Sequence, residues 1–171
     1  MKQEFTTPDE HRGYFISEFA KLERVIDLYF AHYFIRNDNP KFHNELISIL
    51  VDRIPFESKR TALKAILDLL YVDKSAHNGG KKAKEFRVLL EEIGKMARIR
   101  NYYAHYLPVP IPEEELAIAL VQFRDSVNII AYTKEEFNNQ IKQINKCAEI
   151  VANLRRELNN ESAQRPDTKS V

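Results

Sequence analysis

The sequence has few of the residues that build disulfides and metal clusters. Its 171 residues include one cysteine, Cys147, so the chain cannot form an internal disulfide. It contains neither a CxxC motif nor a cluster of His and Cys, which argues against a structural zinc site and fits a reducing compartment. The sequence therefore predicts a cytoplasmic protein that needs neither a structural metal nor a cofactor.

Long apolar runs and a large excess of one charge are also missing. No stretch approaches the roughly 20 apolar residues of a transmembrane helix, and the opening residues MKQEFTTPDEHRGYF lack the apolar core of a signal peptide. We therefore expect no membrane partner. Because the formal net charge is only +1, any contact with nucleic acid must depend on a local basic patch. Residues 81–100 offer one, with seven basic and three acidic residues.

Apolar residues at helical spacing dominate the rest of the chain. Two capping boxes, Thr7 with Glu10 and Thr133 with Glu136, predict the starts of the first and last helices. Residues 119–132 instead alternate as strands do and predict a short β-hairpin. The predicted helices cover residues 7–36, 41–54, 57–72, 81–106 and 134–158. The expected fold class is thus all-α, an up-and-down helical bundle with this hairpin before its last helix.

The predicted elements form one domain. We see no domain boundary and no low-complexity segment within residues 1–158, so we expect them to fold as a single helical unit. Residues 159–171 are polar and contain Pro166, which predicts a disordered tail.

Two similar heptapeptides raise the question of a functional site. RNYYAHY, which begins at Arg100, and DLYFAHY, which begins at Asp27, each carry a histidine five residues after a charged residue. In the predicted helix 81–106 the apolar stripe continues onto Arg100, where a cation needs an anion or a ligand. His105 lies near the predicted end of that helix because Pro108 follows. His32 has no such setting, so the first copy is interpreted as structural.

The segment IRNYYAHY resembles the signature of HEPN domains, an all-helical family with Arg, four to six residues, then His. Arg100, Asn101 and His105 supply the arginine, the polar residue after it and the histidine. Residues 12–106 also resemble the family's helices in order and character. One departure is that Tyr106 directly follows His105, whereas toxins paired with a minimal nucleotidyltransferase antitoxin carry His-x-Tyr.

The resemblance implies a metal-independent RNA endonuclease that works as a homodimer, in a toxin, antiphage or stress-response setting. The residue types suit that chemistry. A histidine can exchange a proton with the 2′-hydroxyl nucleophile or the leaving oxygen, and a guanidinium can hold the phosphate. Arg100, His105 and Asn101 are the predicted catalytic residues. An antitoxin or another regulatory protein is a further expected class of partner.

Other side chains are assigned supporting roles. Tyr102 and Tyr106 are candidates for stacking on bases, although tyrosines at such positions are more often packing residues. Arg98 and Lys59 are candidates for phosphate contacts. The predicted substrate-binding residues are therefore Tyr102, Tyr106, Arg98 and Lys59. Glu23 and Asp27, on the first helix, are the expected anions that hold Arg100.

Two alternatives of other classes remain open from the sequence. The near-neutral charge favours a non-catalytic module that binds a nucleotide, RNA or a partner protein through the same dimer cleft. The intact Arg100, Asn101 and His105 favour the nuclease. The other alternative is a helical protein that only mediates interactions, and a monomeric chain would favour this interpretation.

Overall fold

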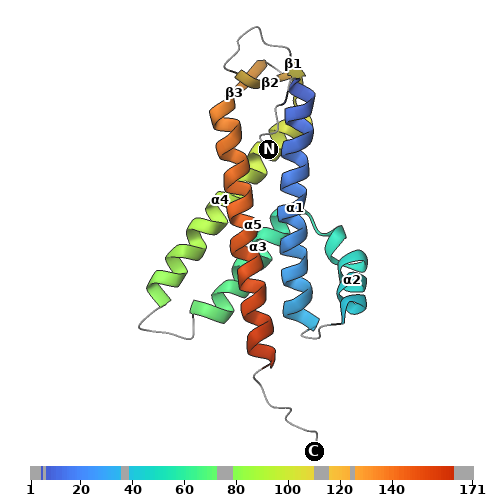
Figure 1. Cartoon of the computed structure of the whole chain (residues 1–171), viewed down its shortest axis with the longest axis vertical. Coiled ribbons are helices and arrows are strands. Elements are labelled where there is room, and N and C mark those ends of the chain that lie inside the picture. The colour runs from blue at the N-terminus through green and yellow to red at the C-terminus, as the bar shows by residue number, and fades with distance from the viewer. Residues whose placement is uncertain are drawn as a thin grey trace, which may run out of the picture.

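Five α-helices and a three-stranded antiparallel sheet make up the part of the chain that the computed structural model describes (Figure 1). The described residues are 5, 7–35, 39–72, 79–109, 116–123 and 126–163. The helices are α1 (Pro8–Ile35), α2 (Pro40–Ile49), α3 (Phe56–Leu67), α4 (Gly79–His105) and α5 (Lys134–Ala163). Short helical turns, η1 (Val51–Arg53) and η2 (Asp68–Val72), follow α2 and α3. The predicted fold class, mainly helical with strands before the last helix, is confirmed.

Both predicted capping boxes are present. The Thr7 amide donates to Glu10 Oε2 at 3.1 Å, and the Glu10 amide donates to Thr7 Oγ1 at 3.2 Å. At the start of α5 the corresponding distances between Thr133 and Glu136 are 2.8 Å and 3.1 Å. Each box satisfies amides that a helix start leaves without partners, so the sequence alone defines where these two helices begin.

The sheet contains one strand more than the predicted hairpin. Strands β2 (Leu116–Phe123) and β3 (Val127–Thr133) are the hairpin, and β1 (Leu107–Val109) pairs with the other edge of β2. Strand β1 was not predicted from the sequence, because Pro108 was interpreted only as a helix terminator. An edge strand tolerates Pro108, since one side of such a strand makes no ladder hydrogen bonds.

The long helices α1 and α5 run side by side along the molecule, and the sheet lies at one end of them (Figure 1). The buried ring of Tyr103 joins these parts. It stacks on Phe15 of α1 at 4.2 Å between ring centroids and on Tyr132 of β3 at 5.8 Å. Its hydroxyl donates to Gln140 of α5 at 3.2 Å. These contacts fix the last turns of α4 against α1, the sheet and α5.

The ends of two helices differ from the prediction. Helix α5 continues to Ala163, so residues 159–163, which were predicted to belong to the disordered tail, are helical. The rest of that predicted tail, residues 164–171, lies outside the described residues. Helix α4 starts at Gly79 and ends at His105, as expected for its carboxyl end. Among the described residues, none of the helices combines the length and apolar character needed to cross a bilayer.

Candidate functional site

The candidate site lies at the carboxyl end of α4. The helix stays regular through His105, and the Tyr106 amide closes its last turn by donating to the Tyr102 carbonyl at 2.9 Å. Pro108 then lies in β1, where it cannot continue the helix. His105 therefore has a defined position on the helix surface, one residue before the turn into the sheet.

Three polar side chains share one exposed strip of α4. Each helical residue turns the chain by about 100°, so Asn101 lies about 40° and Arg98 about 20° from His105 around the helix axis. All three residues are exposed. Arg98 also exerts an electrostatic pull that helps to lower the pKa of Glu57 on α3, after the larger effect of the hydrogen bond from Arg60. The strip thus presents a cation, an amide and an imidazole to solvent.

Arg100 starts from a different face of the helix. It lies about 140° from His105 around the axis and is half-buried, which agrees with its predicted place on the packed side. Its Nη1 nevertheless donates to Asn101 Oδ1 at 3.3 Å. Asn101 therefore draws the guanidinium toward the exposed strip, which gives this amide an orienting role beside the predicted pair.

The sequence did not reveal Arg12 as part of this region. Arg12 lies near the start of α1, and its Nη2 donates to the carbonyl of Ala104 at 3.0 Å. The last carbonyls of a helix lack intrahelical partners and carry partial negative charge, so a guanidinium there is favourable. The contact joins residues 92 positions apart, and no local pattern signals it.

Lys59, Glu23 and Asp27 form a separate buried cluster, which corrects two predictions. Lys59 Nζ lies 2.9 Å from Glu23 Oε1 and 2.9 Å from Asp27 Oδ1. These carboxylates therefore hold Lys59 instead of Arg100, for which the described residues provide no ion pair. With its side chain 3 % exposed, Lys59 cannot contact RNA as we expected.

The cluster keeps its charges inside the protein. Burial disfavours the charged ammonium, but the hydrogen bonds and charges of Asp27 and Glu23 outweigh this effect and raise the pKa of Lys59. Burial raises the pKa of Asp27, against the opposing hydrogen bond and charge of Lys59. The role of this cluster is to join α1 to α3.

The tyrosines of the motif differ in accessibility. Tyr106 is buried, so the stacking role we expected for it would require a rearrangement. Tyr102 is half-buried and lies against Tyr106 with 5.3 Å between the ring centroids. Of the two candidate stacking residues, Tyr102 is the more accessible.

The first AHY copy has a structural environment, as interpreted from the sequence. His32 Nδ1 lies 2.8 Å from the Leu28 carbonyl. Its ring contacts that of His43 on α2, with 4.1 Å between centroids. His32 therefore helps α1 to pack against α2.

An apolar patch adjoins the candidate site. One row across the sheet consists of Leu107 of β1, Val121 of β2 and Ile129 of β3, which pair in that order. Two residues further along β2, Phe123 pairs with Val127 of β3. Directly paired residues of an antiparallel sheet project on the same face. Val121 is buried, but the other four are 57 % to 65 % exposed. This apolar patch, defined as Leu107, Phe123, Val127 and Ile129, begins two residues after His105.

Comparison of the chain with known protein families, with curated proteins and with solved structures finds no match. The described residues also contain no group of three or more His, Cys, Asp or Glu side chains placed to hold a metal ion.

Proposed function

We propose that this protein is a metal-independent RNA endonuclease in which His105 exchanges protons with the reacting oxygens and Arg100 binds the scissile phosphate. The observation that carries the proposal is the hydrogen bond from Arg100 to Asn101, which draws the guanidinium toward the exposed face that bears His105. An exposed imidazole and a guanidinium at the same helix end suit a reaction that moves protons and develops charge on phosphate oxygens.

The surrounding charges support binding of an anionic substrate. Arg98 lies on the same exposed strip as His105, and Arg12 brings a second guanidinium to the carbonyl of Ala104, the neighbour of His105. Such a concentration of cations favours a phosphate backbone, and its contribution falls with added salt. Arg98 and Arg12 are therefore assigned to substrate binding and to positioning, respectively.

The proposal includes a homodimer. Monomeric soluble proteins rarely expose large contiguous apolar patches without a partner, and the four side chains of the apolar patch beside His105 are 57 % to 65 % exposed. A two-fold pairing through this surface would place two copies of the α4 end near each other, so that Arg100 of one copy supplements His105 of the other. This arrangement would offset the angle of about 140° that separates the two residues on one helix.

That same angle favours a second candidate function. If Arg100 and His105 do not converge on one phosphate, the exposed strip still offers cations and an amide for binding. The alternative is therefore a non-catalytic module. It would bind RNA or a nucleotide at the exposed strip, or it would bind a regulatory protein at the apolar patch.

The test is incubation of purified protein with a mixed set of RNAs in the presence of EDTA. The nuclease proposal expects fragments that end in a 2′,3′-cyclic phosphate, because the 2′-hydroxyl is the nucleophile. RNA that is bound but not cleaved would support the binding module. RNA that is neither bound nor cleaved would contradict both the nuclease and an RNA-binding module. The toxin, antiphage or stress-response setting is tested by expression of the gene with and without the His105→Ala change.

A further inference from the structure

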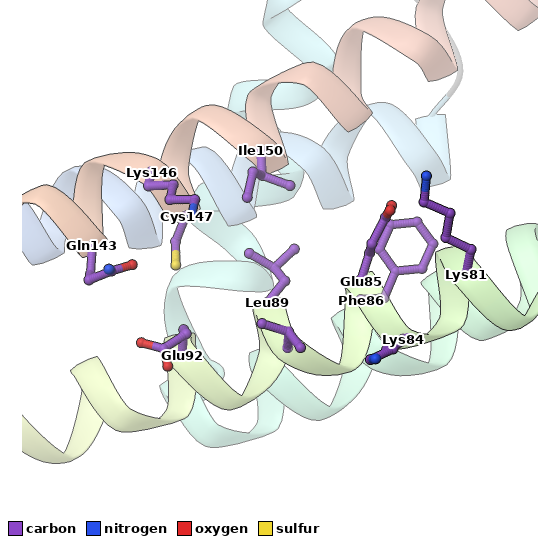
Figure 2. Close-up of a pocket in the computed structure, with 11 residues that line it drawn as sticks. Lys81, Lys84, Glu85, Phe86, Leu89, Glu92, Gln143, Lys146, Cys147 and Ile150 are labelled. Carbon is purple, nitrogen blue, oxygen red and sulfur yellow. The ribbon is translucent and has the colours of Figure 1, made fainter.

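A groove separates the amino-terminal half of α4 from α5, far along the helix from His105. It encloses about 590 Å³, within the range of roughly 300–1,000 Å³ that small-molecule sites occupy. Figure 2 shows Phe86 and Leu89 of α4 facing Cys147 and Ile150 of α5 across it. Val88, at 48 % exposure, also lines it. The middle of the groove is therefore apolar.

The thiol of Cys147 does not alter this apolar character. Burial raises its pKa to about 11, with a further contribution from the charge of Glu92 and an opposing one from Lys146. The sulfur is thus a neutral thiol at physiological pH and behaves as a small apolar group. Ordered water needs several polar partners, which this part of the groove does not offer.

The two ends of the groove differ in charge. Lys81 and Lys84 lie at one end, whereas Glu92, Gln143 and Lys146 lie toward the other, so that a third lysine accompanies the carboxylate there (Figure 2). Neither lysine has a carboxylate within ion-pairing distance among the described residues. Glu85 also lines the lysine end, so two cations face one anion there.

Helix geometry adds to the attraction of the lysine end for an anion. The first turn of α4 contains no acidic residue, and the amides of a helix start carry partial positive charge. From Lys81 to Glu92 the helix rises about 16 Å, so the apolar middle separates the cationic end from an end where the ammonium of Lys146 offsets the carboxylate of Glu92. An elongated molecule with one anionic end would place that end at Lys81 and Lys84 and its apolar body along the middle.

From this arrangement we infer that the groove binds an elongated apolar molecule with one anionic end, such as a fatty acid or a lipid-type phosphate. The anionic group lies between Lys81 and Lys84, and the apolar body lies along Phe86, Leu89 and Ile150. The inference is independent of the proposed RNA cleavage, because it involves none of the residues at the carboxyl end of α4.

The experiment is a fluorescence titration of the full chain with anilinonaphthalene sulfonate, an apolar probe with one anionic group. Phenylnaphthylamine, which lacks the sulfonate, is the matched neutral probe. The double change Lys81→Gln/Lys84→Gln should weaken binding of the sulfonate probe about fivefold or more, which is the usual effect of removing partly exposed charges. The affinity for the neutral probe should change by less than about twofold. Lys95→Gln, on the same helix outside the groove, and Lys142→Gln on α5 are the controls.

A second variant tests the cavity itself. Val88→Trp should fill the mouth of the groove and prevent binding of both probes, whereas Ile49→Trp, at an exposed site on α2, should not. This pair separates the groove from the other exposed apolar surfaces to which such dyes bind. Thermal unfolding should show that each variant is folded. Unchanged sulfonate binding in Val88→Trp, or in the double lysine variant, would overturn the inference.

Competition identifies the head group. Dodecanoate and dodecyl phosphate should displace the sulfonate probe from the wild-type protein, and the stronger competitor indicates which anion the groove prefers. Dodecanol, with the same chain and no charge, should displace it far less. Equal displacement by the alcohol would contradict a role for the lysines.

Discussion

The guanidinium of Arg12 on α1 donates a hydrogen bond of 3.0 Å to the carbonyl of Ala104, the residue before His105 on α4. This contact links the start of the chain to the candidate site. It satisfies a carbonyl that the end of α4 would otherwise leave to water. It also places a cation beside the proposed acid–base group.

Replacement of Arg12 should therefore reduce the rate of RNA cleavage without abolishing substrate binding. We expect Arg12→Met to lower kcat on the order of tenfold, because a small displacement of a reacting group is costly, with KM nearly unchanged. The lost hydrogen bond should cost about 0.5–1.5 kcal/mol of stability. The conservative variant Arg12→Lys, which keeps a cation at this position, should retain most of the wild-type kcat. Arg24→Met, at an exposed arginine of the same helix, is the control; if it lowers kcat equally, the positioning role is wrong.

The two AHY copies give a direct test of the proposed catalytic residues. His105→Ala should lower cleavage by about 10²–10⁴-fold, the usual contribution of acid–base assistance, while the protein remains folded. Arg100→Ala should be about as severe. His32→Ala should alter activity only as far as it disturbs the contact with His43 and hence folding. Cleavage rates with EDTA, beside circular dichroism, provide the measurement. Loss of activity in a well-folded His32→Ala protein, with His105→Ala active, would reverse the assignment.

The buried lysine cluster should contribute to stability and not to RNA contact. Lys59→Met leaves Glu23 and Asp27 without their cation, and we expect it to cost about 3–5 kcal/mol in urea unfolding. Lys64→Met removes an exposed ion pair with Asp68 on the same helix segment and should cost less than about 1 kcal/mol. Adding Glu23→Gln and Asp27→Leu to Lys59→Met should recover much of the loss. If Lys59→Met and Lys64→Met lower the free energy of unfolding by similar amounts, the buried cluster contributes no more stability than an exposed ion pair does.

Stability should fall in alkaline solution partly because of Tyr132. Burial, with smaller effects from Tyr102, Glu136 and Tyr106, raises the pKa of Tyr132 to about 12, above the roughly 10 of an unfolded chain. A group with a raised folded-state pKa contributes stability that is fully present below about pH 10 and is lost as pH rises through 12.

Urea unfolding at a series of pH values, with ultraviolet detection of tyrosinate, measures this effect. Tyr132→Phe should lose less stability between about pH 10 and 12 than the wild type does. The raised pKa values of Lys59 and Tyr103 act in the same direction, so part of the decline should persist in the variant. An identical pH profile for both proteins would contradict the role of Tyr132.

The apolar patch should mediate self-association. Ile129→Lys places a charge within the patch and should weaken the dimer at least about tenfold, because an unpaired charge in an apolar interface is costly. Ile49→Lys changes an isoleucine of nearly equal exposure, 64 % against 62 %, on α2. Sedimentation velocity at micromolar concentration compares the two. A wild-type monomer would rule out the dimer, and a fully dimeric Ile129→Lys protein would place the interface elsewhere.

Local sequence determined most of the secondary structure. Capping boxes such as Thr7 with Glu10 involve residues three positions apart, and the strand alternation in residues 119–132 is equally local. The carboxyl end of α4 at His105 followed from Pro108 for the same reason, since proline restricts its immediate neighbour. These features are predictable because the interactions that produce them lie within one turn or one strand pair.

Only the tertiary structure decided which charged side chains meet. Glu23 and Asp27 lie four residues apart on α1, and the sequence could not tell whether that face packs on α3 or on α4. The structure turns it toward α3, where Lys59 takes both carboxylates at 2.9 Å, and Arg100 is left to Asn101. Arg12 reaches Ala104 in the same way, through the approach of two helices distant in sequence. Such pairings depend on how helix faces pack, and packing is a property of the whole chain.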